Sequence, residues 1–157
     1  VLERTSDAMG RGASVLASLS GVGCANDAAA LGRPAPDGRG LVAAIETCLE
    51  DAQAQAKDID LVLTGSVGTQ IEDTLEQAAL ETVFGSDVPP SGSSKRSTGF
   101  AMGSAALVEV ALAIAALQRK SIPNCVTGDS TPVGAVLCNA IGLNGQFGAT
   151  LVRSVSV

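Results

Sequence analysis

The sequence predicts an α/β domain in which helices cover a mixed five-stranded sheet, with the elements in the order β-α-β-α-β-α-β-β. Two observations support this. Hydrophobic residues make up 46% of the 157 positions, yet the aromatic residues are three Phe only, so the core must consist of small and aliphatic side chains, which suit close packing of helices on a sheet. Strand-like and helix-like hydrophobic patterns also alternate along the chain. We expect one domain over residues 1–157.

The first half of the chain predicts two strands, each followed by a helix. Residues 14–22 alternate apolar with small polar side chains, as a strand does, whereas apolar residues recur at helical spacing over 39–56. The short apolar run 58–65 predicts the second strand. The helix expected over 71–85 ends at Gly85, because a left-handed backbone is easiest for Gly.

The second half predicts a long apolar helix and a closing hairpin. Residues 99–119 are nearly all small or apolar, so we expect a central helix buried on more than one face. Two successive helices on one sheet usually enclose a strand, which we place near Val88. Runs 134–142 and 145–154 read as strands joined by a Gly-rich turn around 143–145. This hairpin is expected to add an antiparallel edge to a mostly parallel sheet.

Composition argues against several classes of partner. The net charge is −6, and the ten Lys and Arg residues are scattered along the chain, so we expect no nucleic acid and no anionic membrane as a partner. No apolar run reaches the ~20 residues of a membrane-spanning helix, and the sequence shows no signal-peptide pattern at its start. We therefore predict a cytoplasmic protein.

Cysteine spacing and the absence of His bear on metal chemistry. The sequence has no His, and its four Cys lie far apart without CxxC spacing, so we predict no metal site and no cofactor. We expect all four to be buried free thiols. They are Cys24, Cys48, Cys125 and Cys138.

Four segments together resemble a known family. They are "VLERTSDAMGRGASVLASLSGVGCANDA" at 1–28, "GRGLVAAIETCLEDAQAQAKDIDLV" at 38–62, "SSKRSTG" at 93–99 and "LCNAIGLNGQFGATLV" at 137–152. In order and spacing they are similar to the C-terminal half of a thiolase-fold condensing enzyme, a β-ketoacyl-acyl carrier protein synthase of the elongating type. The resemblance implies the C-terminal half of a thiolase-like fold.

The residues that carry this family's chemistry are replaced. Such enzymes use a Cys nucleophile at a helix N-terminus and two His that stabilise a thioester enolate. The Cys would lie in the N-terminal half of the fold, which this sequence does not contain. Gly65 stands at the position of the first His, and Phe100 stands at the position of the second, whereas Lys95 is retained; Asp73 and Glu76 match acidic positions of the family. Because Gly and Phe side chains form no hydrogen bonds, we predict no catalytic residue here.

The resemblance also implies a substrate pocket. Its residues would be Thr98, Gly99, Phe100, Asn144, Gly145 and Phe147. Phe100 could fill the former catalytic volume or be an ordinary core aromatic on a buried helix. Lys95 could organise charge near the former catalytic centre or be a solvated loop lysine. Residues 144–147 match a Gly-rich loop that gates acyl access, although Asn144 and Phe147 depart from the usual Gly and Asn; the alternative is a plain hairpin turn.

Three functions follow as alternatives. The first is a non-catalytic, chain-length-factor-like subunit or fragment in fatty-acid or polyketide assembly, with a synthase subunit or complementary half and an acyl carrier protein as partners. The second is a split condensing or acyltransferase enzyme in which another chain brings the Cys, and Lys95 or ordered water replaces His. The third is a scaffold module.

The two halves of a thiolase-like fold share a central helix layer, so this half should expose a large apolar face. The connection 123–134 is shorter than the family's.

Overall fold

The computed structural model describes residues 1–30, 32–127 and 132–155. Residues 128–131, within the connection predicted to be short, lie outside the described residues. The strands are β1 (Ser18–Asn26), β2 (Leu61–Leu63), β3 (Ser91–Gly92), β4 (Val126–Thr127), β5 (Ala135–Ile141) and β6 (Gln146–Arg153). The α-helices are α1 (Thr5–Gly10), α2 (Arg39–Asp51), α3 (Gln70–Phe84), α4 (Lys95–Thr98) and α5 (Ala105–Arg119), and two 3₁₀ turns are η1 (Ala56–Asp58) and η2 (Met102–Ser104).

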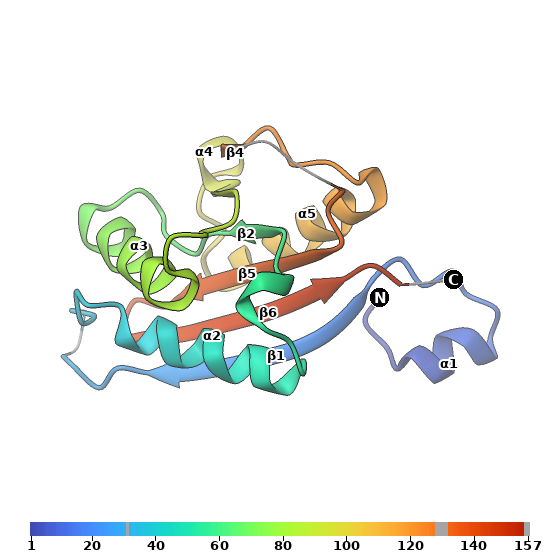
Figure 1. Ribbon diagram of the computed structural model, residues 1–157, viewed down its shortest axis with the longest axis horizontal. Helices are drawn as coiled ribbons and strands as arrows, with labels where there is room; N and C mark the ends of the chain where they lie inside the picture. Colours follow the sequence, from blue (N-terminus) through green and yellow to red (C-terminus); the bar gives the residue numbers. More distant parts are fainter. Residues whose placement is uncertain (31, 128–131, 156–157) are drawn as a thin grey trace.

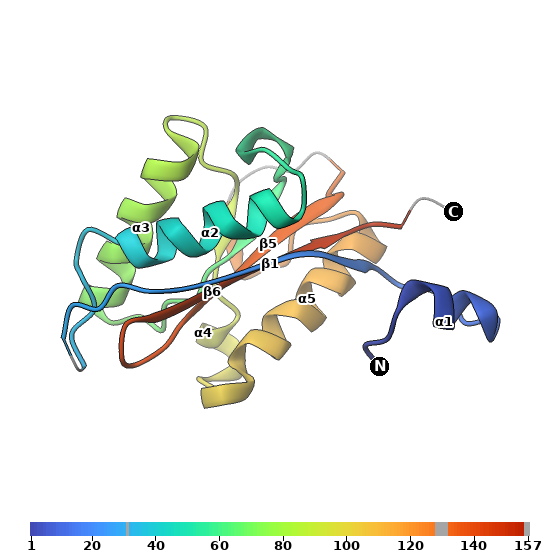
Figure 2. The same ribbon diagram turned by 90° about the horizontal axis from the view of Figure 1, so that it is seen from below.

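The helices lie in two layers, one on each face of the sheet. Figure 2 shows α2 and α3 on one face and α5 on the other, while α1 lies apart from this body at the N-terminal end. One buried cluster fills the space between α2, α3 and the sheet, and a second lies between α5 and the opposite face. This three-layer arrangement confirms the predicted α/β class.

Over the part of the chain that the structure describes, the sheet has six strands in the order β1-β6-β5-β2-β3-β4 (Figure 1). Parallel pairing joins β3, β2 and β5, whereas β6 runs antiparallel to both β5 and β1. The sixth strand, β4, pairs with β3 over two residue pairs and was not predicted. The third predicted strand, placed near Val88, is β3 at Ser91–Gly92.

The hairpin β5–β6 lies in the interior of the sheet, so its predicted edge position was wrong. Six of the seven residues of β5 are buried, as expected for a strand covered on both faces. The edge is instead β1, which pairs with β6 along nearly its whole length. β1 extends four residues beyond its predicted end. A side chain at Gly23 would overlap the backbone of α2, so a glycine at this position lets the helix pack closely on the strand.

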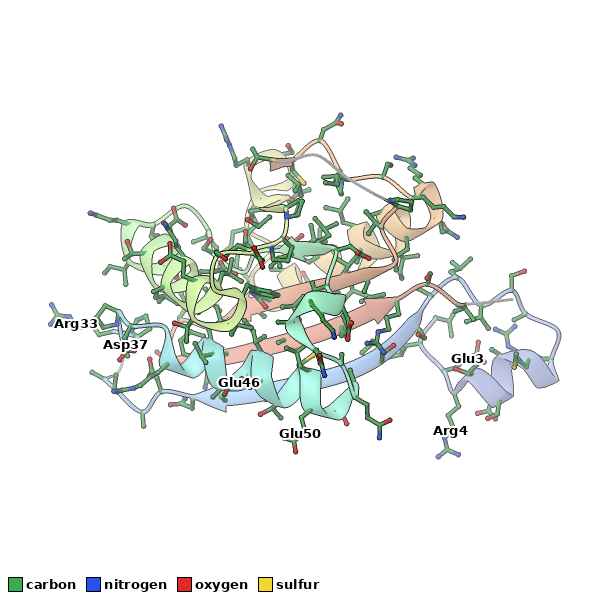
Figure 3. All side chains as sticks on the ribbon, in the orientation of Figure 1. Glu3, Arg4, Arg33, Asp37, Glu46 and Glu50 are labelled. Carbon is green, nitrogen blue, oxygen red and sulfur yellow. The ribbon has the colours of Figure 1, made fainter. Side chains whose placement is uncertain are left out.

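Helix α5 is buried on one face only, which corrects the prediction of a helix buried on several faces. It also begins at Ala105, because the chain first forms α4 and η2. By length and composition alone, the segment Met102–Arg119 is long and apolar enough to cross a membrane. In the structure 22% of this segment is buried. Leu107 is 70% exposed. The outer face of α2 carries charged side chains instead, and Figure 3 shows Glu46 and Glu50 extending from it.

The four thiols differ in burial, so their prediction holds only in part. Cys48 and Cys138 are buried, Cys125 is half-buried, and Cys24 is exposed. Cys24 follows Gly23, which faces α2, and successive strand residues point to opposite faces. Its side chain therefore lies on the face of the edge strand that α2 does not cover. Burial raises the pKa of Cys48 to about 11 and raises that of Cys138 further.

Candidate functional site

A cavity of about 260 Å³ opens beside the end of β2. Its walls come from the loop after β2, the segment from α4 to the start of α5, and the hairpin β5–β6. Residues far apart in sequence therefore meet here. Four of the predicted site residues line this cavity: Gly65, Lys95, Phe100 and Phe147.

The other predicted pocket residues lie outside the cavity lining. Thr98 is exposed, and its hydroxyl donates to the Ser94 carbonyl in α4 (3.2 Å). Gly99 ends that helix with a φ of 74°. Asn144 is exposed and Gly145 is buried in the turn between β5 and β6. These four residues shape the segments behind the cavity rather than its surface.

Lys95 is held by an ion pair beside the cavity. Its Nζ donates to Oε1 of Glu109 (3.0 Å) and to the Thr64 carbonyl (2.8 Å), and its side chain is 7% exposed. The Ser94 hydroxyl donates to the same Glu109 oxygen (2.8 Å). The reading of Lys95 as a solvated loop lysine was therefore wrong. Sequence reasoning missed Glu109. A lone acidic residue within an apolar helix was the signal that could have indicated a paired, buried carboxylate.

Glu76 fixes the turn that follows β2. Its carboxylate, which is buried, accepts the N–H of Gly65 (2.9 Å), the N–H of Ser66 (2.7 Å) and the amide of Asn139 (3.0 Å). Hydrogen bonds to a charged acceptor are stronger than neutral ones. Helix α3 therefore holds the loop after β2 against β5. The sequence had marked Glu76, whereas Asn139 was missed because a polar residue in a buried strand gives no indication of its partner.

Gly65 leaves little room for a side chain. A Cβ built there would lie 3.0 Å from the Ile141 nitrogen and 3.1 Å from the carbonyl carbon of Ala140. Both atoms belong to the backbone of β5, which cannot move without disturbing the sheet. The position predicted to match the family's first His is therefore tightly bounded by the backbone of β5.

Phe100 is 39% exposed and lies in the loop between α4 and η2. The alternative of a core aromatic on a buried helix was wrong, because α5 begins only at Ala105. Its ring occupies part of the cavity wall. Phe147, which also lines the cavity, is 3% exposed and belongs to the main core cluster.

The site can accommodate an apolar group but carries little acid–base chemistry. Of the described residues, Lys95 is the one charged residue that lines the cavity, and its ammonium is paired. Burial raises the pKa of the neighbouring buried thiol, Cys138, which therefore stays protonated and a poor nucleophile. Among the described residues, no group of three or more His, Cys, Asp or Glu could hold a metal ion.

The fold and the site define the C-terminal half of a thiolase-like condensing-enzyme domain. The chain belongs to the family "Beta-ketoacyl synthase, C-terminal domain", whose model matches residues 16–129. Nodulation protein E of Rhizobium sp. (strain N33) is 32% identical over 125 residues, which is 78% of this chain and 31% of that protein.

Two solved structures have similar folds. The ishigamide ketosynthase/chain length factor superposes with a TM-score of 0.89 at 23% identity, covering 98% of this chain and 42% of that one. The ketosynthase ApeO in complex with its chain length factor ApeC, from Xenorhabdus doucetiae, gives a TM-score of 0.80 at 26% identity, covering 90% and 40%. This chain thus spans about a third of the length of the first curated relatives and two fifths of these structures.

Proposed function

We propose that this chain is a non-catalytic, chain-length-factor-like part of a β-ketoacyl synthase assembly in fatty-acid or polyketide biosynthesis. It would shape the acyl pocket and contribute to the dimer interface. The observation that carries this proposal is the cavity itself. At the positions where the resemblance places the family's two His stand Gly65, which is tightly bounded by backbone, and Phe100, which lines the cavity wall. Neither side chain can polarise a thioester carbonyl.

The geometry argues against the split-enzyme alternative. That alternative has Lys95 or ordered water replace a catalytic His, and Nζ of Lys95 is already bound by Glu109 and the Thr64 carbonyl. Releasing it would leave Glu109 as an unpaired buried carboxylate, which is costly. Lys95 therefore acts on the architecture of the site and not as an acid or base.

The apolar face of α5 supports a partner that covers it. Between Glu109, which faces inward, and Arg119 the helix carries no charge, and Leu107 is exposed. An apolar face of this length is typical of a protein interface. We propose a synthase subunit or the complementary half of the fold as the partner, and an acyl carrier protein as the donor of the acyl chain. The cytoplasmic location stays a prediction.

Turnover of the chain alone and in its assembly tests this function. Incubated by itself with acyl- and malonyl-carrier protein, the chain should release no carbon dioxide above background. The assembly that copurifies with it should release carbon dioxide, and the nucleophile trapped by an acyl thioester should belong to an intact synthase active site. Turnover by the chain alone would refute the non-catalytic role, and acyl trapping at a Cys whose pocket is completed only by this chain would favour the split enzyme.

A further inference from the structure

The turn between β5 and β6, residues 142–146, forms one wall of the cavity. Gly142 and Gln146 line the cavity, and so does Phe147, the next residue of β6. The N–H of Gly142 donates to the Gln146 carbonyl (2.7 Å) and closes the turn. The position of this turn therefore sets how much space the cavity offers.

Asp27 holds the turn from the side of β1. Its N–H donates to the Gly145 carbonyl (3.1 Å). Gly145 has a φ of 71°, and a Cβ there would overlap the Asp27 carboxylate, so only Gly fits. The same carboxylate accepts the N–H groups of Ala29 (3.0 Å) and Ala35. Asp27 thus ties the turn to the loop that follows β1.

Phe147 holds the turn from the side of α2. Its ring is 3% exposed and packs against Gly40 in the first turn of that helix. A Cβ at Gly40 would lie 2.5 Å from two carbons of the ring. The ring therefore occupies a notch that exists because position 40 has no side chain, and any movement of Phe147 would leave a void in the main core.

We infer that Asp27 and Phe147 are positioning residues that clamp the turn 142–146 and fix this cavity wall before any ligand binds. The two contacts come from separate segments, the loop after β1 and helix α2, and both act at the β6 end of the turn, on Gly145 and on Phe147. The hydrogen bond from the Gly142 N–H to the Gln146 carbonyl joins the other end of the turn to this held end. A wall held by two separate segments gives the cavity a constant limit. This inference rests on the proposed function. It assigns to the fixed wall the role of setting the length of an apolar acyl chain in the cavity, and not that of a gate that opens to admit the chain.

Hydrogen exchange on the chain in the assembly that copurifies with it measures the clamp directly. Asp27→Asn keeps the side-chain size and the backbone N–H that binds Gly145, but it weakens the carboxylate hydrogen bonds with the N–H groups of Ala29 and Ala35 that hold Asp27 in place. Phe147→Leu leaves a gap at Gly40. Each should speed exchange of the Gly142 N–H roughly tenfold, the size expected for losing one charged hydrogen bond or a comparable packing contact. Matched controls, Asp87→Asn at an exposed site and Phe84→Leu at the buried C-terminal end of α3, should leave that exchange unchanged.

The chain lengths of the products that the assembly makes from malonyl-carrier protein give an independent readout. Faster exchange together with a broader or longer product distribution in Asp27→Asn and Phe147→Leu, but not in the controls, supports the inference. Unchanged exchange in both variants overturns the clamp. Faster exchange with an unchanged product distribution keeps the clamp and overturns the proposed role of this cavity in shaping the acyl pocket.

Discussion

Lys95 and Glu109 form an ion pair behind the cavity, with 3.0 Å between Nζ and Oε1 and side chains that are 7% and 1% exposed. The pair joins α4 to α5. The charges are also bound by the Thr64 carbonyl and the Ser94 hydroxyl. Removing one partner of a pair buried this deeply lowers the stability of the fold strongly, because the charge left behind cannot be solvated.

Breaking this pair should destabilise the chain strongly. Glu109→Gln should lower the free energy of unfolding by about 3 to 5 kcal/mol, because Lys95 keeps its charge without a counterion. The double variant Lys95→Met/Glu109→Leu should recover most of that loss. Urea denaturation measures each value.

The exposed pair of Arg39 with Asp37 (3.8 Å) is the matched control, and Figure 3 shows Asp37 at the periphery of the molecule. Asp37→Asn should cost roughly 0 to 1 kcal/mol. If Glu109→Gln costs no more than this control, the buried pair does not have the importance we assign to it.

The closed position at Gly65 predicts an asymmetry between two glycines of the same cavity. Gly65→Ala should destabilise the chain by about 1 to 3 kcal/mol, since the new methyl group meets the backbone of β5. Gly103→Ala is the control, because nothing lies within 4 Å of a Cβ at that position. Thermal unfolding of both variants provides the comparison, and equal midpoints would contradict the tight packing at Gly65.

Cys48 predicts a loss of stability at alkaline pH. Burial raises its pKa from 9.0 to about 11, outweighing the hydrogen bond from the Leu151 backbone. The folded chain therefore holds the thiol proton more tightly than the unfolded chain does. This contribution is complete below about pH 9 and is lost as the pH rises to about 11, a change of about 2 to 3 kcal/mol.

Urea denaturation at pH 7, 9 and 10.5 measures that loss. Cys48→Ala should be less stable at every pH because of the space it leaves, but its stability should fall less between pH 9 and 10.5. Part of the decline should remain, since burial also raises the pKa of Cys138. A wild-type stability that stays flat over this range would show that the thiol is not desolvated.

A substitution at Leu107 tests whether a partner covers the exposed face of α5. Leu107→Glu should leave the stability of the isolated chain within about 0.5 kcal/mol, because the side chain is 70% exposed. It should abolish association with the partner, since a charge would be buried at the interface. Thr47→Glu, on the exposed face of α2, should leave association intact. Light scattering after size exclusion distinguishes the two, and equal association of both variants would place the interface elsewhere.

Local signals in the sequence were sufficient for the regular elements. Helix α3 was predicted to within one residue at each end, because Gly85 stops it and the acidic residues of its first turn suit the helix dipole. The hairpin β5–β6 followed from two apolar runs around a Gly-rich turn. The family motifs supplied Gly65, Lys95, Phe100 and Phe147, which meet at one cavity. In each case the information lies within a few neighbouring residues.

Contacts between distant segments decided the rest. Whether the hairpin lies at the edge or the centre depends on β1 pairing with β6, more than a hundred residues away along the chain. Pairing across such a separation leaves no local pattern to read.

The same reason explains what was missed at the site. The sequence by itself determined which side chains the cavity could contain, and its resemblance to the condensing enzymes predicts that Gly65 and Phe100 stand at the two His positions. Only the tertiary structure decided that Lys95 pairs with Glu109, that β5 closes Gly65, and that Phe147 fits the notch at Gly40. These outcomes depend on distances between α4, α5, β2, β5 and α2, because burial and pairing energies arise only once packed elements exclude water from between them.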